Sequence, residues 1–133
     1  MKNHKTQTKT VKIGQHKAGG RIMLEAQWLA EAGFPCGQKY IIKNIVPIND
    51  GIASFGPARI KLIAEGTNGS KALAAMGGTS RAVSGGWTSS RRKACPVIDI
   101  KGVNRTFGEE ATHAALEISQ GKIVITEGKA HQP

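Results

Sequence analysis

Two segments of this chain, one near each end, share a similar order of hydrophobic and polar positions. The first begins with an alternating run at 21–25, which predicts a strand. Trp28, Leu29 and Ala32 follow at helical spacing, so we expect a helix of about two turns there. Gly33 is placed to end this helix, because glycine adopts the left-handed cap conformation without steric cost.

A predicted hairpin completes the first segment. Apolar runs at 40–46 and 52–55 flank an Asn-Asp-Gly sequence at 49–51, which is a turn signal between strands. The alternating stretch at 59–63 either extends this hairpin or pairs with it. Before the segment, Val-Lys-Ile at 11–13 predicts one further short strand.

The second segment repeats this order with less helix. Alternation at 97–100 predicts a strand, and 115–118 and 123–125 predict a hairpin whose turn needs a positive φ at Gly121. Between them, the Gly-Glu-Glu sequence at 108–110 predicts the start of a short helical turn, because negative charge suits the amino end of a helix.

These patterns predict a mainly β protein with short helices. A segment of about forty residues is too small to bury a stable core alone. We therefore expect the two segments to pack together within one chain, or with a second copy of it. The predicted divisions are a disordered basic arm at 1–10, a first segment at 11–65, a glycine- and serine-rich basic loop with one helical turn at 66–95, a second segment at 96–128, and a tail at 129–133.

Charge is distributed unevenly along the 133 residues, whose formal net charge is +10. Basic and acidic residues nearly balance within 25–65 and 96–133, whereas the rest of the chain holds eleven Lys or Arg residues and no Asp or Glu. Cationic extensions on a compact body are typical of proteins that bind nucleic acid, since phosphate contacts supply most non-specific affinity.

Other classes of protein fit the sequence less well. No apolar run approaches the roughly 20 residues that span a bilayer, and the basic residues lie on no amphipathic helix, which argues against a membrane partner. The first residues, Met-Lys-Asn-His-Lys, lack an apolar signal core, so we expect a cytoplasmic protein. Cys36 and Cys95 form no disulfide framework and are expected to be reduced thiols.

The aromatic residues divide into two groups. Trp28, Phe34 and Tyr40 lie at spacings typical of core positions, and base stacking is the alternative for them. Trp87 lies in the basic loop, where base stacking and simple anchoring of the loop remain equally open. The nearby Arg-Arg-Lys run at 91–93 either neutralises phosphates or is a solvated charge run, and the absence of acids around it favours phosphate.

Nothing in the sequence argues positively for catalysis, a metal or a cofactor. The stretch at 66–71 looks like a phosphate-cradling loop but lacks the glycine before Lys71 and the hydroxyl residue after it. A metal-dependent nuclease would need clustered carboxylates, and only Asp99, Glu109 and Glu110 come near one another. The cysteines and histidines show no zinc-binding spacing. We therefore expect neither a metal site nor a cofactor.

One part of the chain resembles a known family. Residues 21–55 resemble a SymE-type toxin domain of the AbrB/SpoVT swapped-hairpin superfamily. One position departs from the pattern, because Ala26 stands where that family usually has glycine or serine. The second segment, at about 96–128, resembles a degenerate copy that keeps Gly102. The match to the family rests on Trp28, Leu29, Ala32, Gly33, Phe34 and Gly37.

The resemblance implies two half-barrels that interleave their hairpins around a shared core. The two copies in this chain would form a pseudo-dimer internally, or two chains would form a homodimer. Many members of the superfamily bind DNA through basic residues on a β-surface and its flanks, whereas SymE is regarded as a toxin that affects nucleic acid. The fold alone does not decide between these functions.

Charge and resemblance together predict a small nucleic-acid-binding regulator or accessory protein of bacterial or bacteriophage origin, with duplex DNA favoured over RNA. One alternative is a SymE-like toxin that acts on RNA or DNA, with nuclease activity as its enzymatic form. Another is a phage-borne inhibitor that docks on a host protein. The predicted nucleic-acid-binding residues are Lys5, Lys9, Lys12, Lys17, Arg21, Lys71, Arg81, Trp87, Arg91, Arg92 and Lys93.

Overall fold

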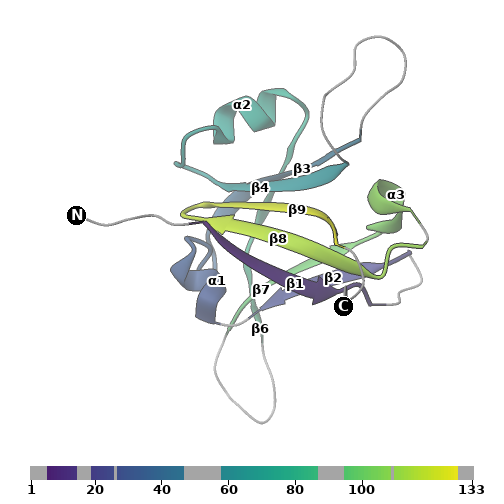
Figure 1. Cartoon of the computed structure of the whole chain (residues 1–133). Coiled ribbons are helices and arrows are strands. Elements are labelled where there is room, and N and C mark those ends of the chain that lie inside the picture. Colours follow the sequence, from purple (N-terminus) through teal and green to yellow (C-terminus); the bar gives the residue numbers. More distant parts are fainter. Residues whose placement is uncertain are drawn as a thin grey trace.

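The structure is a computed structural model that describes residues 6–14, 19–25, 27–46, 58–86, 95–108 and 110–128. Within these ranges the protein is mainly β, as the sequence predicts, with antiparallel strands and three short helices (Figure 1). The elements are β1 (Gln7–Lys12), β2 (Arg21–Glu25), α1 (Gln27–Glu31), β3 (Lys39–Ile45), β4 (Arg59–Ala64), α2 (Ser70–Ala75), β5 (Thr79–Ala82), β6 (Ser84–Gly86), β7 (Cys95–Lys101), α3 (Asn104–Phe107), β8 (His113–Ser119) and β9 (Lys122–Gly128).

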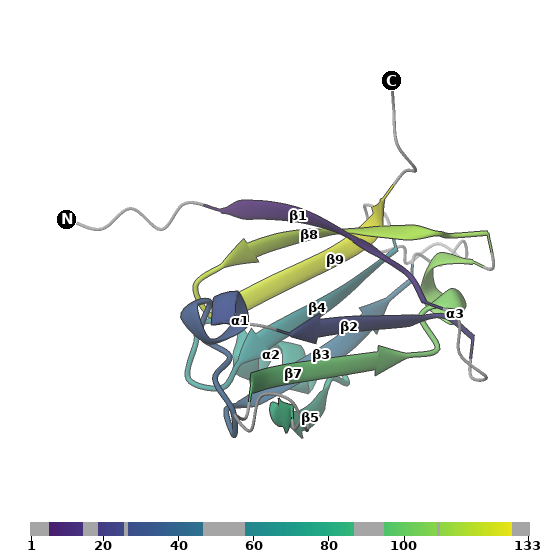
Figure 2. The same ribbon diagram turned by 90° about the horizontal axis from the view of Figure 1, so that it is seen from below.

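The strands of the described residues form two antiparallel sheets. The larger sheet has the order β1-β8-β9-β4-β3-β5, and the smaller has the order β2-β7-β6. Figure 2 shows β2 and β7 crossing one side of β3 and β4. The sheets are joined at both edges, because Gly14 bridges to Arg21 at the start of β2, and Val83 alone separates β5 from β6. Together they enclose one core.

The strand order of the larger sheet reads the same from either half of the chain. We call β1 to β4 the first half and α2 to β9 the second half. The two hairpins, β3–β4 and β8–β9, meet through β4 and β9, and β2 pairs with β7. Each leading strand pairs with the hairpin of the other half, β1 with β8 and β5 with β3. The helices also contact the opposite half, since α1 contacts β7 and α3 contacts β4. Each half therefore completes the other.

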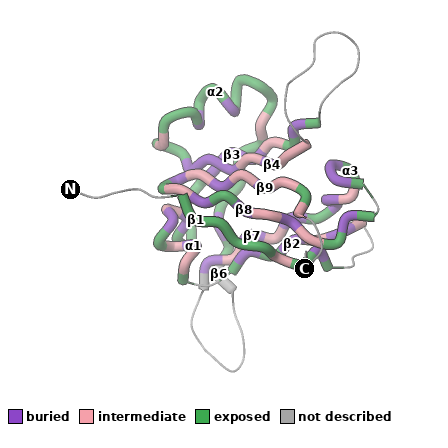
Figure 3. The backbone as a smooth tube through the Cα atoms, viewed as in Figure 1, coloured by how far each residue is buried: buried purple, intermediate pink, exposed green. Residues whose placement is uncertain are grey.

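The core lies between the sheets and draws on both halves (Figure 3). The inward-facing side chains of the central strands β4 and β9 are fully buried, among them Ile60 and Ile123. Phe34 is also fully buried and meets Tyr40 edge to face, with ring centroids 6.0 Å apart. Gly33 has a φ of 102°, which lets the chain fold back after α1 so that Phe34 enters the core. The predicted cap is confirmed.

Most predicted elements of the two segments are confirmed. The strands at 21–25 and 97–100 correspond to β2 and β7, and the predicted hairpin at 115–125 corresponds to β8 and β9. Its turn residue, Gly121, has a φ of 76°. The stretch at 59–63 forms β4 and pairs with β3. The turn predicted at 49–51 and the strand predicted at 52–55 lie outside the described residues.

The structure differs from the prediction in the basic arm. Gln7–Lys12, partly expected to be disordered, forms β1 and pairs along its whole length with β8. Its side chains are mostly exposed, so the strand is held by backbone hydrogen bonds rather than by burial. Thr8, Thr10 and Val11 are β-branched and suit a strand. A lack of apolar residues therefore did not prevent pairing with an open sheet edge.

The region predicted as a basic loop also contains regular structure. The expected helical turn is α2, whose Leu73 is buried against Ile41 and Ile63 of the first hairpin. Residues 79–82 and 84–86 form β5 and β6, which the sequence analysis did not predict. The sequence does not predict β5, because this strand is exposed along its length and carries no alternation of buried residues.

The second segment contains one incorrect prediction. The helix there is α3, which precedes Gly108 rather than starting at it. Gly108 has a φ of 95° and ends the helix, and the Asn104 side-chain amide donates to its carbonyl oxygen at 2.7 Å. The acidic Gly-Glu-Glu sequence predicts a helix start, but a glycine with positive φ is typical of a helix end.

Candidate nucleic-acid interface

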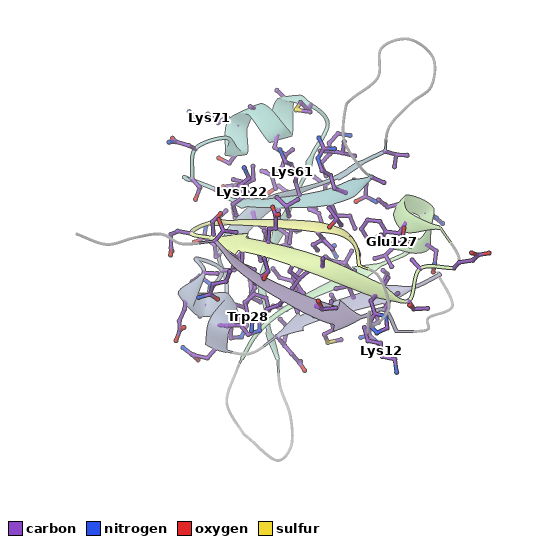
Figure 4. All side chains as sticks on the ribbon, in the orientation of Figure 1. Lys12, Trp28, Lys61, Lys71, Lys122 and Glu127 are labelled. Carbon is purple, nitrogen blue, oxygen red and sulfur yellow. The ribbon has the colours of Figure 1, made fainter. Side chains whose placement is uncertain are left out.

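The predicted binding residues are spread over the fold rather than gathered in one place. Lys9 and Lys12 belong to β1, at one edge of the larger sheet, and Arg81 belongs to β5, at the other edge. Arg21 begins β2 and Lys71 lies on α2 (Figure 4). The remaining six predicted residues lie outside the described part of the chain: Lys5, Lys17, Trp87, Arg91, Arg92 and Lys93.

Two of these cations have partners within the protein. The Lys9 ammonium lies 5.3 Å from the centroid of the Trp28 ring, a cation–π arrangement on a half-buried indole that packs against the core. The Arg21 guanidinium makes a two-pronged ion pair, in which Nε donates to Asp99 Oδ1 at 2.9 Å and a terminal nitrogen donates to Oδ2 at 3.0 Å. The hydrogen bond to Asp99 raises the pKa of Arg21. Both cations are therefore less available to a phosphate.

A denser group of cations lies on the outer face of β3, β4 and β9. Most inward positions of these strands are apolar and buried, so side-chain alternation places the intervening basic residues outside. Lys43 lies directly opposite Lys61 in the β3–β4 ladder. Figure 4 shows Lys61 and Lys122 on the neighbouring strands β4 and β9. We call the four residues of this group the cationic face: Lys43, Arg59, Lys61 and Lys122.

Electrostatic crowding on this face is strongest at Lys61. Partial burial lowers the pKa of Lys61, and the neighbouring cations Lys122 and Arg59 lower it further. Among the described residues, no carboxylate lies within ion-pairing distance of Lys43, Lys61 or Lys122. Like charges directly opposite each other in a sheet destabilise the fold. The folded protein therefore holds a charge arrangement that a bound anion would relieve.

A cavity of about 400 Å³ adjoins the cationic face, between β3, β5 and the end of β7. Lys43, Arg81 and Lys101 line it, and the described lining contains no acidic residue. Ile42 and Ile100 supply apolar contacts. Lys43 thus belongs both to the cationic face and to the cavity.

The cavity exists because β5 is shorter than β1, its counterpart in the first half. β1 pairs with six residues of β8, whereas β5 pairs with four residues of β3. The Gly78 N–H donates to the Leu73 carbonyl oxygen of α2 at 3.0 Å, which turns the chain away before it can pair with Asn44. A Cβ at Gly78 would clash with Ile41 and lie 2.9 Å from the Leu73 oxygen, so this close approach requires glycine.

The chain was also compared with known proteins. No family model, curated protein or solved structure matches it. Within the described ranges, no three His, Cys, Asp or Glu side chains come together as they would to hold a metal ion. No helix in that part of the chain is long and apolar enough to cross a membrane. Function must therefore be inferred from geometry and charge.

Sequence reasoning missed the cationic face and Lys101. It treated both segments as electrically balanced, since each holds nearly equal numbers of acids and bases. The fold separates part of this charge, since Glu25 and Glu31 lie at the ends of β2 and α1, while Glu117 lies at an outward position of β8, the strand beside β9. One signal was present in the sequence. Arg59 and Lys61 are two residues apart within an apolar strand, and this spacing places both on one face.

Proposed function

We propose that this protein binds nucleic acid, duplex DNA first, through the cationic face and the predicted basic arm and loop. The observation that carries the proposal is the placement of Lys43 opposite Lys61, with Lys122 on the next strand. Like charges side by side reduce folding stability, and phosphates bound across them would offset that loss.

The spacing of the cationic face suits a line of phosphates. Adjacent strands are about 5 Å apart, so the three strands of the face span about 10 Å. Phosphates of one DNA strand advance by about 3.4 Å each along the helix axis. A face that spans three strands can therefore contact several phosphates at once. Contacts to phosphates position a protein on DNA without reading its sequence.

We also propose that the fold is an internal pseudo-dimer of two swapped-hairpin half-barrels. Three features support this arrangement: the strand order of the larger sheet, which reads the same from either half, the pairing of β1 and β5 with the hairpin of the other half, and the contacts of α1 and α3 with the opposite half. In this arrangement one chain completes its own core, and a homodimer is not needed for folding.

A mobility-shift experiment tests the proposed function. The wild type is titrated into one sequence as duplex DNA, single-stranded DNA and RNA, with and without Mg²⁺. We expect it to shift the duplex most, and Lys61→Gln to weaken that binding several-fold, since one phosphate contact is lost. Arg105→Gln is the matched control, because Arg105 is an exposed cation on α3, which is not part of the cationic face.

The other outcomes distinguish the alternatives. Tighter binding to RNA, or cleavage of either nucleic acid that depends on Mg²⁺, would replace the proposal with a SymE-like toxin. If none of the three nucleic acids binds at low salt, the proposal is wrong. Docking on a host protein would then be the stronger explanation of the basic charge.

A further inference from the structure

We infer that the cavity between β3, β5 and β7 binds a terminal phosphate monoester, as found at the phosphorylated end of a nucleic-acid strand. The inference rests on the proposed function for the source of that phosphate. The lining of the cavity shares only Lys43 with the cationic face.

The charge of the cavity matches a monoester better than the continuous backbone. Lys43, Arg81 and Lys101 approach it from three different strands, and no acidic residue lines it in the described part of the chain. A phosphate monoester carries a charge of about −1.5 to −2 at pH 7, because its second pKa is about 6. A backbone diester carries only one negative charge. Three cations in the lining of one cavity therefore favour the monoester.

The strand ladders also direct backbone donors toward the cavity. Arg21 exchanges both of its backbone hydrogen bonds with Gly14, so its partner Lys101 belongs to a pair without hydrogen bonds in the β2–β7 ladder. The Lys101 N–H consequently points away from β2, on the side of the cavity. In the β3–β4 ladder, too, alternate residues of β3 direct their N–H groups away from β4. The Asn44 N–H is one of these, and it lies beyond the residues of β3 that pair with β5.

Size and shape favour a strand end. The volume of about 400 Å³ falls in the usual range for small-ligand pockets, about 300–1,000 Å³. A continuous duplex lies across a sheet face and cannot enter such a cavity, whereas the last nucleotide of a strand has a free side. Because Lys43 belongs to both regions, a strand bound on the cationic face can end in the cavity.

The test compares one oligonucleotide with four ends: a 5′-hydroxyl, a 5′-phosphate, a 3′-phosphate and a 5′-methylphosphate. The methylphosphate has nearly the size of the phosphate but only one negative charge. We expect one of the two phosphorylated strands to bind roughly 10-fold more tightly than the hydroxyl strand, as one or two additional charge-assisted hydrogen bonds would give. The methylphosphate strand should bind like the hydroxyl strand.

Variants assign the preference to the cavity. The double variant Arg81→Gln/Lys101→Gln should bring the ratio between phosphorylated and hydroxyl strands close to one. Lys61→Gln should weaken binding of every strand and keep the ratio, because Lys61 does not line the cavity. Arg81 and Lys101 are exposed, so the double variant should retain the wild-type melting temperature. A preference that survives this variant contradicts the inference.

The two proposals fail in different ways. If all four strands bind equally to the wild type with a steep salt dependence, the cavity inference is wrong and the proposed function stands. A second probe covers the opposite case, in which no oligonucleotide binds. Thymidine 5′-monophosphate should then still raise the melting temperature of the wild type, but not of the double variant, if the cavity takes free nucleotides. No stabilisation by this nucleotide in that case would overturn the inference as well.

Discussion

Both halves of the protein contain a leading strand, a strand of the smaller sheet, a short helix and a hairpin, but the second half adds α2 and β6, and the leading strands differ. In the first half, β1 pairs with β8 over six residues and closes the sheet edge. In the second half, β5 pairs with β3 over four residues, because the chain comes from α2 and joins the sheet only at Thr79. The position that backbone fills in one half is a cavity in the other. A short helical insertion thus creates a candidate site without disturbing the shared core.

The outer faces of the two hairpins differ in a similar way. The first hairpin carries Lys43 and Lys61 directly opposite each other, and α2 covers its apolar pair, Ile41 and Ile63. The second hairpin contributes only Lys122 to the cationic face, and the outward positions of its β8 include Ala115 and the acidic Glu117. The inner faces of both hairpins remain apolar and buried. Both hairpins are therefore apolar on the buried side, while their outer surfaces differ in charge.

Core substitutions should have the largest effects and should reveal whether the halves contribute equally. Phe34 follows α1 and is fully buried, whereas Phe107 ends α3 with 9% of its surface exposed. We expect Phe34→Ala to lower the free energy of unfolding by about 3–5 kcal/mol, and Phe107→Ala to lower it by less. Chemical denaturation measures both values. A larger loss at Phe107 would contradict the account of the core.

Trp28 provides a comparison on the same helix. Because its ring is only half-buried and is partly covered by Lys9, Trp28→Ala should cost less than Phe34→Ala. This expectation is lower than the sequence alone suggests, since the spacing of Trp28 is that of a fully buried core residue. Equal losses from the two substitutions would mean that Trp28 is as important for the core as Phe34.

Substitution of Gly78 should test why the leading strands differ. An added Cβ would clash with Ile41, so we expect Gly78→Ala to lower the free energy of unfolding by about 1–3 kcal/mol. Gly14, beside β1 in the first half, is the matched control. A Cβ there would lie 3.7 Å from the Arg21 carbonyl oxygen, an ordinary contact. Thermal melting should find Gly14→Ala near neutral, and similar losses at both positions would contradict this explanation.

Lys61→Gln should have the smallest effect on stability, and its sign is informative. Removing one of two facing cations should raise the free energy of unfolding at pH 7 by about 0.2–1 kcal/mol, although the same change weakens DNA binding. Arg105→Gln should give no such gain. A loss of stability in Lys61→Gln would mean that its aliphatic stem matters more for packing than its charge does for repulsion.

The pH dependence follows from the lowered pKa of Lys61. The unfolded chain holds its proton more tightly than the folded protein, so the wild type gains stability as pH rises through the folded-state pKa toward the ordinary lysine value. The advantage of Lys61→Gln should therefore shrink between pH 7 and pH 10. Denaturation curves of both proteins over this range measure the difference. An advantage that does not change would remove charge repulsion as its cause.

Elements with a buried face could be predicted from the sequence. The alternation at 21–25 predicted β2, and the helical spacing before Gly33 predicted α1 and its cap. Strands without a buried face could not be predicted in this way. The side chains of β1 and β5 are mostly exposed, and both strands exist because an open sheet edge offers hydrogen bonds. That edge is formed by residues far away in the chain.

The candidate site was harder to predict from the sequence than the strands, because it depends on the three-dimensional arrangement of distant residues. The balance of charge within each segment concealed the cationic face, because acids and bases that are close in sequence lie on different elements. The ion pair between Arg21 and Asp99 joins residues 78 positions apart, so sequence reasoning counted Arg21 as an available cation. The cavity could not be predicted either, since it depends on how far along β3 the chain joins the sheet after α2.

The salt dependence of duplex DNA binding tests the central claim most directly. If the wild type makes roughly five to nine phosphate contacts, the logarithm of its affinity should fall with the logarithm of salt concentration with a slope of about −4 to −8. In the triple variant Lys43→Gln/Lys61→Gln/Lys122→Gln, the slope should be shallower by about three units, one for each lost contact. A flat response in the wild type, or the same slope in both proteins, would contradict binding through the cationic face.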